Sequence, residues 1–167
     1  MIGARTCCLV GLALGVAACG SGADADTGSS AGSIAGGVQD SSWTKLSSAY
    51  WIGKPGAGSS PVIFFLFESH VDCSTLVNPN WDKVGISDFQ SLEVDMLDEE
   101  LRDHSVGSDV DVAYLKGFYN PSADSGSVTL SEVKEGESLK GSFDVAFGTD
   151  MLHGTFTAQF CADGVEP

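Results

Sequence analysis

The stretch that decides the fold covers residues 139–160 and reads LKGSFDVAFGTDMLHGTFTAQF. In residues 139–147 and again in residues 152–160, every second position holds an apolar residue or a glycine. Both halves fit the pattern L-x-G-[ST]-F-x-[VA]-x-F, thirteen residues apart. An apolar period of two is typical of a strand that buries one face. The stretch therefore predicts two half-buried strands that follow each other in the chain.

Residues 148–151 (GTDM) connect these strands and suit a four-residue hairpin loop. If the hairpin closes symmetrically, Phe143 lies opposite Phe156 and Val145 lies opposite Gly154. Large side chains would then meet across the strands, and the glycines would leave room for a facing sheet. This hairpin is the most specific structural prediction that the sequence allows.

Four other segments are predicted to be strands, namely residues 61–68 (PVIFFLFE), 89–96, 110–119 and 127–133. The first is apolar at nearly every position, as expected for a central strand covered on both faces. Residues 98–104 (DEELRDH) are predicted to form one helical turn. Short strands separated by turns favour an all-β fold, either a small antiparallel β-sandwich or a partly open barrel of about six to eight strands.

The N-terminus carries a leader. Arg5 precedes twelve apolar or small residues at positions 7–18 (CCLVGLALGVAA). This length suits the apolar part of a signal peptide and is well short of the roughly 20 residues that cross a bilayer. The segment ends in Val16-Ala17-Ala18-Cys19, which resembles the lipobox of bacterial lipoproteins.

The resemblance implies that residues 1–18 are a signal peptide, that the thiol of Cys19 receives diacylglycerol, and that cleavage makes Cys19 the first mature residue. Two or three acyl chains would hold the protein firmly in a membrane. We therefore expect a lipid-anchored protein of the cell envelope. Because Gly20 rather than aspartate follows the cysteine, a Gram-negative host would be expected to place it in the outer membrane, on the periplasmic or surface face.

Residues 20–42 consist almost entirely of Gly, Ser, Ala, Asp and Thr. So little apolar surface cannot offset the entropy lost on ordering the chain. We expect a flexible tether over residues 19–42, which begins with the lipidated cysteine, and a single β domain over residues 43–167.

The chain is acidic, with 8 Lys and Arg against 23 Asp and Glu. Cleavage before Cys19 removes Arg5 and no acid, so 7 basic and 23 acidic side chains remain, a formal charge of −16. Such a charge repels phosphate backbones, so nucleic acid is not an expected partner. Cationic partners, calcium and plain solubility all remain compatible with it.

Five cysteines are present, and Cys7, Cys8 and Cys19 belong to the leader and its end. The two that remain, Cys73 and Cys161, are predicted to form a disulfide in an oxidising compartment. Cys161 shares the alternation of the outward-facing Thr157 and Gln159, and we therefore expect the bond at the edge of the domain.

The C-terminal part also contains a recognisable series of short sequence patterns. It runs from Gly117-Phe118-Tyr119 through Gly126-Ser127-Val128-Thr129-Leu130 to Phe160-Cys161. This resembles small uncharacterised lipoproteins that are common in myxobacteria. The resemblance implies a β-sandwich whose final cysteine bonds to an earlier one, and it implies no active site.

No catalytic residue stands out. The sequence has no G-x-S-x-G nucleophile elbow, and the histidines at 70, 104 and 153 lack zinc-binding spacing, so no cofactor is expected. Carboxylates are the remaining chemistry. Asp109 and Asp111 share one face of a predicted strand and are weak candidates for calcium ligands. The more common alternative is a solvated acidic face.

These observations favour a lipid-anchored envelope or surface lipoprotein with a non-catalytic binding or structural β domain. Its partner, besides the membrane, would be a protein or a polysaccharide that the sequence does not identify. The alternative is a secreted hydrolase that uses carboxylates, with glycosides as one substrate class.

Overall fold

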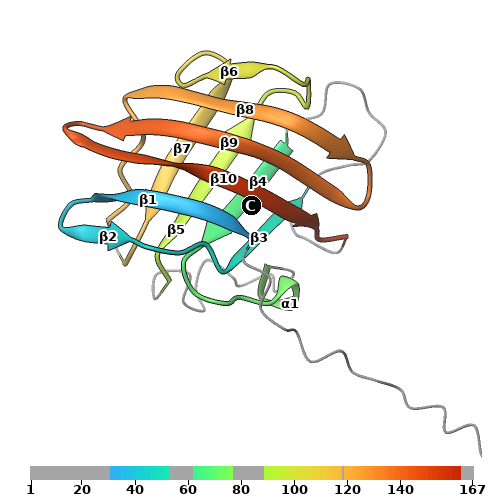
Figure 1. Ribbon diagram of the computed structural model, residues 1–167, viewed down its shortest axis with the longest axis horizontal. Coiled ribbons are helices and arrows are strands. Elements are labelled where there is room, and N and C mark those ends of the chain that lie inside the picture. The colour runs from blue at the N-terminus through green and yellow to red at the C-terminus, as the bar shows by residue number, and fades with distance from the viewer. Residues whose placement is uncertain (1–30, 53–61, 77–88, 118, 163–167) are drawn as a thin grey trace, which may run out of the picture.

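The computed structural model describes residues 31–52, 62–76, 89–117 and 119–162. These residues form ten strands and one short helix (Figure 1). The strands are β1 (Gly32–Val38), β2 (Ser41–Trp43), β3 (Ser48–Ile52), β4 (Val62–Phe67), β5 (Ser91–Met96), β6 (Asp103–Ser105), β7 (Val110–Leu115), β8 (Ser125–Lys134), β9 (Ser138–Phe147) and β10 (Asp150–Phe160), and the helix is α1 (Cys73–Leu76). The prediction of an all-β fold is confirmed.

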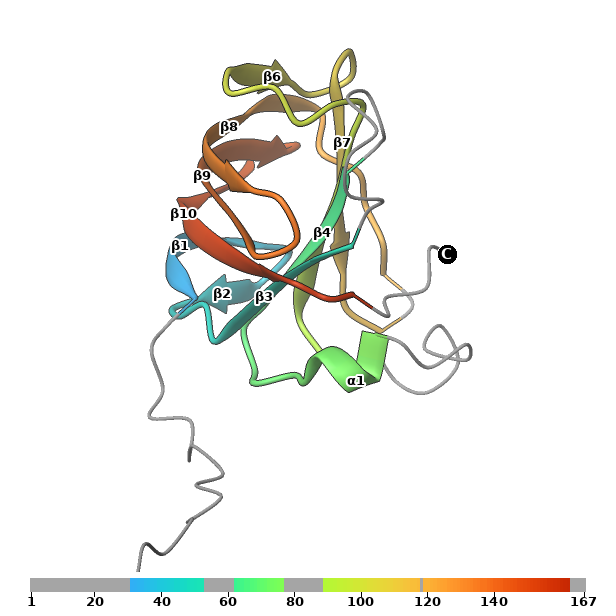
Figure 2. The ribbon, with the colours of Figure 1, turned by 90° about the vertical axis from the view of Figure 1, so that its right-hand side faces the viewer.

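One sheet contains all ten strands and curls nearly into a barrel. The strand order is β6-β8-β9-β10-β3-β4-β5-β7. Outside this order, β1 pairs with β10, and β2 pairs with β1. All neighbouring strands are antiparallel except β10 and β3. The two ends of the order meet where Val106, just after β6, bridges Val110 of β7. Figure 2 shows the layer of β1, β8, β9 and β10 beside the layer of β4 and β7.

The β9–β10 hairpin is present, but its predicted register is wrong by two residues. Phe147 pairs with Asp150, so the loop contains only Gly148 and Thr149. Gly148 has φ of 66°, which permits a two-residue turn with a positive φ at its first position. The apolar faces are unchanged, because a shift of two residues preserves the alternation of a strand.

The shifted register places each central aromatic ring opposite a glycine. Phe143 pairs with Gly154, and Phe156 pairs with Gly141. A Cβ atom on Gly141 would lie 2.7 Å from Cζ of Phe156, and one on Gly154 would lie 3.0 Å from Cζ of Phe143. The rings therefore occupy the space that the missing side chains leave on the sheet.

The main core lies between the two layers. Phe156 of β10 stacks on Phe64 of β4, with ring centroids 4.7 Å apart. The opposite face of β4 carries Phe65 and Phe67, which are fully buried in a second apolar cluster. The prediction that this strand is covered on both faces is confirmed.

The predicted tether is wrong for residues 32–42, because they form the β1–β2 hairpin. β1 pairs with β10 from Gly32 to Gly36, and its two large apolar side chains, Ile34 and Val38, enter the main core. A segment with only these two apolar side chains cannot be recognised as a strand by composition. With β1, β2 and β6 included, the sheet has more strands than the six to eight that we expected.

Candidate binding site

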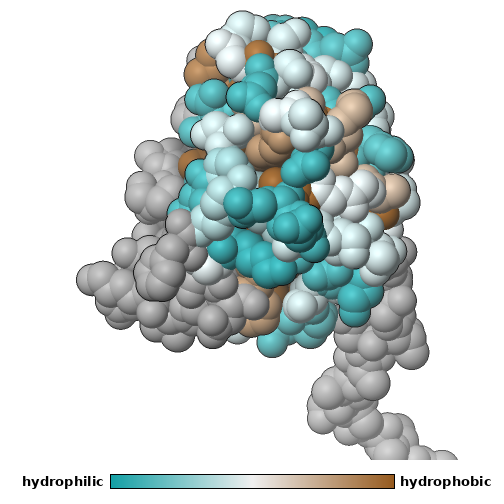
Figure 3. Space-filling view, turned by 90° about the vertical axis from the view of Figure 1, so that its left-hand side faces the viewer, coloured by the Kyte–Doolittle hydropathy of each residue, from teal (hydrophilic) through white to brown (hydrophobic). Residues whose placement is uncertain are grey.

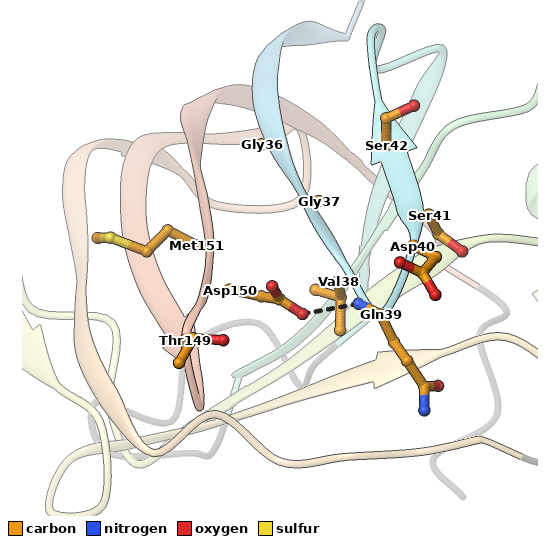
Figure 4. A pocket seen from close by; sticks show the side chains of 10 residues that line it. All are labelled: Gly36, Gly37, Val38, Gln39, Asp40, Ser41, Ser42, Thr149, Asp150 and Met151. Atoms are coloured by element: carbon orange, nitrogen blue, oxygen red, sulfur yellow. Dashed lines mark hydrogen bonds between the residues drawn. The ribbon is translucent and has the colours of Figure 1, made fainter.

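A polar groove of about 520 Å³ lies at the end of the barrel where the β1–β2 and β9–β10 turns project (Figure 4). Residues from two distant parts of the chain line it: Gly36, Gly37, Val38, Gln39, Asp40, Ser41, Ser42, Thr149, Asp150 and Met151. Figure 3 views the molecule from this end, where hydrophilic residues surround a few apolar ones.

The groove exists because β1 and β10 separate near their turns. Their pairing ends with Gly36 opposite Leu152. Beyond this point the side chain of Asp150 connects the two turns, and its Oδ2 accepts a hydrogen bond of 2.8 Å from the backbone N–H of Gln39 (Figure 4). At Gly36, φ is 114° and a Cβ atom would lie 1.9 Å from the carbonyl oxygen of Met151, so only glycine fits.

The β1–β2 turn holds two strained residues. Gln39 and Asp40 have φ of 45° and 63°, and a two-residue turn with both φ values positive is normally made by Asn-Gly. The left-handed conformation costs a non-glycine residue about 1–2 kcal/mol. Both side chains are exposed at the groove, where they offer an amide and a carboxylate. Strain that leaves polar groups exposed beside a groove supports a functional role for the turn.

The predicted Cys73–Cys161 disulfide is confirmed, with Cα atoms 5.8 Å apart. It joins the start of α1 to the residue after β10. Cys161 does face away from the main core, but it is buried with Ile52 and Phe65 in the second apolar cluster. The bond therefore lies in a packed cluster on the outer side of the sheet rather than at an open edge. Neither domain cysteine is a free thiol nucleophile.

The predicted signal peptide, the predicted lipidation site Cys19 and the predicted tether up to residue 30 lie outside the described residues. Within the described residues, no helix has the length and apolar character needed to cross a membrane.

Asp109, the first calcium candidate, belongs to a cluster centred on Arg102. The guanidinium of Arg102 lies 2.9 Å from Asp98, 3.0 Å from Glu100 and 3.2 Å from Asp109. Asp109 also accepts a hydrogen bond of 3.3 Å from the backbone N–H of Ser105. The hydrogen bond from Ser105 and then that from Arg102 lower the pKa of Asp109. Oδ2 of Asp109 is therefore already bonded to two protein groups.

The same cluster explains why the predicted helical turn at residues 98–104 is wrong. Residues 101 and 102 form a bend, and Asp103 and His104 already belong to β6. Arg102 holds Asp98 beside it, and the backbone N–H of Glu100 donates a hydrogen bond of 3.0 Å to Asp98. Burial alone would raise the pKa of Asp98, but these two hydrogen bonds together with the nearby charges, chiefly that of Arg102, lower the pKa. Side-chain hydrogen bonds to the backbone thus replace helical ones.

Asp111, the second calcium candidate, is not among the carboxylates that pair with Arg102. It stands on the outward face of β7, opposite Asp95 of β5, and Glu93 lies further along the same face. None of the three carboxylates has a hydrogen bond or an ion pair with a described residue. Burial and next the charge of Asp95 raise the pKa of Glu93, while burial and next the charge of Asp111 raise the pKa of Asp95.

The two calcium candidates line one small hollow of about 90 Å³ together with Asp95, but Arg102 already pairs with the carboxylate of Asp109. In the described ranges, no three or more His, Cys, Asp or Glu side chains are arranged to hold a metal ion. Of the three histidines, His104 is fully buried, and its Nε2 lies 2.9 Å from the carbonyl oxygen of Glu100. His70 lies on the surface beside Asp72, with an Nε2–Oδ1 distance of 3.3 Å.

Comparison of the chain with protein-family models, with curated proteins and with solved structures finds no match. The geometry of the groove is thus the basis for assigning chemistry to it. Sequence reasoning missed this site because its residues lie in the predicted tether and in the hairpin loop. The sequence does contain a signal for the β1–β2 turn, namely Gly36-Gly37 followed by residues 38–41 (VQDS). An interpretation based on composition alone does not detect it.

Proposed function

We propose that this chain is a lipid-anchored envelope or surface lipoprotein whose β domain binds a ligand and performs no catalysis. The observation that carries the anchoring is the sequence Val16-Ala17-Ala18-Cys19 at the end of an apolar leader. The observation that supports binding is the open polar groove between the β1–β2 and β9–β10 turns.

The position of β1 supports a short distance between the anchor and the domain. β1 begins at Gly32, so the twelve residues 20–31 separate it from Cys19. Twelve residues span at most roughly 40 Å when fully extended. A domain on such a spacer would meet ligands that lie close to the membrane surface.

The groove suits a neutral, hydroxyl-rich ligand such as a polysaccharide. Asp40 and Asp150 accept hydrogen bonds, and Ser42 and Thr149 both donate and accept them. Two carboxylates and an acidic chain repel anionic ligands. Met151, which is more than half exposed, adds an apolar contact for the carbon-bearing face of a sugar ring.

The anchoring is tested by fractionating cells of a lipoprotein-processing bacterium that express the full chain. The wild type should be found in the membrane, with an intact mass that fits a diacylglycerol-modified N-terminus at Cys19. Cys19→Ala should be unprocessed or released. Cys8→Ala is the matched control, since it removes a leader thiol outside the lipobox, and it should behave as the wild type. A processed, membrane-bound Cys19→Ala protein would refute the proposal.

The binding site is tested by titrating the full chain in detergent with soluble dextran, cello- and chito-oligosaccharides. Asp40→Asn should weaken binding about tenfold, as expected for the loss of a hydrogen bond to a charged group. Asp144→Asn, which changes an exposed carboxyl on β9 away from the groove, should leave binding unchanged. Equal binding by the two variants would refute this site.

The hydrolase alternative has one observation in its favour. Glu93 and Asp95 have raised pKa values, and a carboxyl that keeps its proton more readily is suited to act as a general acid. The same oligosaccharides therefore serve a second assay, the release of reducing ends. Release by the wild type that is lost in Glu93→Gln would establish the alternative in place of simple binding.

A further inference from the structure

The segment that follows β7 contacts both walls of the groove. Nζ of Lys116 donates a hydrogen bond of 2.8 Å to Oγ of Ser41, which lines the groove at the start of β2. Asp124 accepts a hydrogen bond from the backbone N–H of Gly148, the neighbour of Thr149 in the β9–β10 turn. Residues 116–124 therefore lie at the same end of the barrel as the groove.

Tyr119 lies between these two contacts and is unusually exposed for an aromatic residue. At 39 % it is the most exposed aromatic residue that the structure describes. Its backbone is fixed by two hydrogen bonds with Lys116. The N–H of Tyr119 donates to the carbonyl of Lys116 over 3.1 Å, and the N–H of Lys116 donates to the carbonyl of Tyr119 over 3.2 Å. The residue that contacts Ser41 thus also holds Tyr119 in place.

The ring of Tyr119 rests on buried aromatic side chains. It contacts the ring of Tyr114 on β7, with centroids 6.2 Å apart and planes at 66°. Tyr114 also packs against Phe147 at the end of β9 and Trp43 at the end of β2, with centroids 6.2 Å and 6.4 Å away. Phe147 and Trp43 belong to the strands that lead to the two walls of the groove. The core therefore fixes the position of Tyr119 relative to the groove.

An exposed aromatic ring next to a polar groove suits a ligand made of several sugar units. A hexose has an apolar face of C–H groups and a rim of hydroxyls. The hydroxyls of one unit can bond to the groove, while the apolar face of another lies on an aromatic ring. Tyrosine offers a large rigid surface for such a contact and has few rotatable bonds to immobilise. Single exposed apolar residues are common, but Tyr119 differs from a scattered one because it is held rigidly beside the groove.

We propose that Tyr119 forms a second sugar subsite beside the groove, which makes the ligand an extended polysaccharide rather than a single sugar. The inference rests on the proposed binding of sugars in the groove. One unit bonds to Asp40 and its neighbours, and a later unit of the same chain passes Ser41 and stacks on Tyr119. The second contact is available only to a chain long enough to reach both subsites.

The subsite is tested by titrating the full chain in detergent with cello- and chito-oligosaccharides from two to six units long. The affinity of the wild type should rise with length until both subsites are filled. Tyr119→Ala should weaken binding of the six-unit chains about tenfold, as suits the loss of an aromatic contact, and the loss should be confined to the longer chains. Tyr119→Phe keeps the ring and should recover most of this loss.

Leu101→Ala is the matched control, because it removes an exposed apolar side chain from the loop between β5 and β6. It should bind every length as the wild type does. A second measurement is the NOE between the ring protons of Tyr119 and the C–H protons of a bound six-unit chain, which should be visible in the wild type.

The outcomes separate the second subsite from the groove. Equal losses at all lengths in Tyr119→Ala, or no loss at any length, would overturn the subsite, while Asp40→Asn still tests the groove. A missing NOE in the saturated complex would overturn the subsite even if Tyr119→Ala failed to fold. A wild type that binds none of the oligosaccharides would overturn the proposed ligand class and the subsite together.

Discussion

Two acidic regions of this protein lie close together in the chain and differ in the sign of their pKa shifts. Around Arg102, the pKa values of Asp98 and Asp109 are lowered. On the outward face of β5, the pKa values of Glu93 and Asp95 are raised. Each region contains at least three acidic side chains. The difference comes from the counter-charge of Arg102 and from backbone donors, whereas Glu93 and Asp95 have no such partner among the described residues.

The contrast is sharpest for Asp109 and Asp111, which are two residues apart. Asp109 precedes β7 and turns toward Arg102, whereas Asp111 lies within β7 and faces Asp95 across the strands. Like charges directly opposite each other destabilise a sheet. Acidic residues that are close in sequence therefore need not share a role, and the predictions below test the two regions against each other.

Arg102→Leu should give the largest effect, because it leaves three carboxylates without their cation. We expect the Tm to fall by about 5 °C, measured by circular dichroism at pH 7 and low salt. Arg102→Lys keeps the charge without the planar fork and should recover part of the loss. A Tm of Arg102→Leu equal to that of the wild type would mean that solvent already screens the cluster.

Asp98→Asn should lower the Tm less, by about 2–4 °C at pH 7. Because the pKa of Asp98 is lowered in the folded protein, its stabilisation is present above the ordinary aspartate pKa and is lost as the pH falls through the folded value. Melting curves of variant and wild type should therefore converge once the pH is below the folded pKa of Asp98. A difference that persists at that pH would point to packing rather than charge.

Glu93→Gln should raise the Tm at pH 7, whereas the two preceding variants lower it. Since the pKa of Glu93 is raised in the folded protein, its contribution is most favourable below the ordinary glutamate pKa and is lost as the pH rises through the folded value. The variant should melt a few degrees above the wild type at pH 7 and together with it at pH 4. Glu137→Gln, in the exposed β8–β9 turn, is the control and should show neither change.

Asp111→Asn should give the smallest effect, a gain of about 0.5 kcal/mol in the free energy of unfolding at pH 7, because it removes one of two opposed charges. Urea denaturation measures it, and an NMR titration should show a lower pKa for Asp95. Asp144→Asn on β9 provides the comparison for a general loss of negative charge. A destabilised Asp111→Asn protein would show that the carboxylate makes a favourable contact.

The face that each strand buries could be predicted from the sequence. Alternation in residues 139–160 identifies the buried side of β9 and β10, and the continuous apolar run in β4 predicts burial on both sides. The pairing of Cys73 with Cys161 could also be predicted from the sequence, because no other thiols are left outside the predicted leader. These features depend on local chemistry, which the order of residues contains.

The register of the hairpin was decided by the tertiary structure. A four-residue loop and a two-residue loop place the same side chains on the same face, so alternation cannot distinguish them. The packing of Phe143 over Gly154 and of Phe156 over Gly141 selects the shorter loop. Likewise, β1 has too few apolar residues to be recognised as a strand from the sequence alone. Its strand conformation is stabilised by pairing with β10.

For the candidate sites as well, some features could be predicted from the sequence and others depend on the tertiary structure. The sequence by itself determined that the domain is acidic and that Asp109 and Asp111 lie near other carboxyl groups. Only the tertiary structure decided that Arg102 neutralises Asp109 while Asp111 faces Asp95. It also brought Asp150 beside Gln39, residues separated by 111 positions, to form the groove. Such contacts depend on which strand ends meet in space, and no local pattern in the chain encodes that meeting.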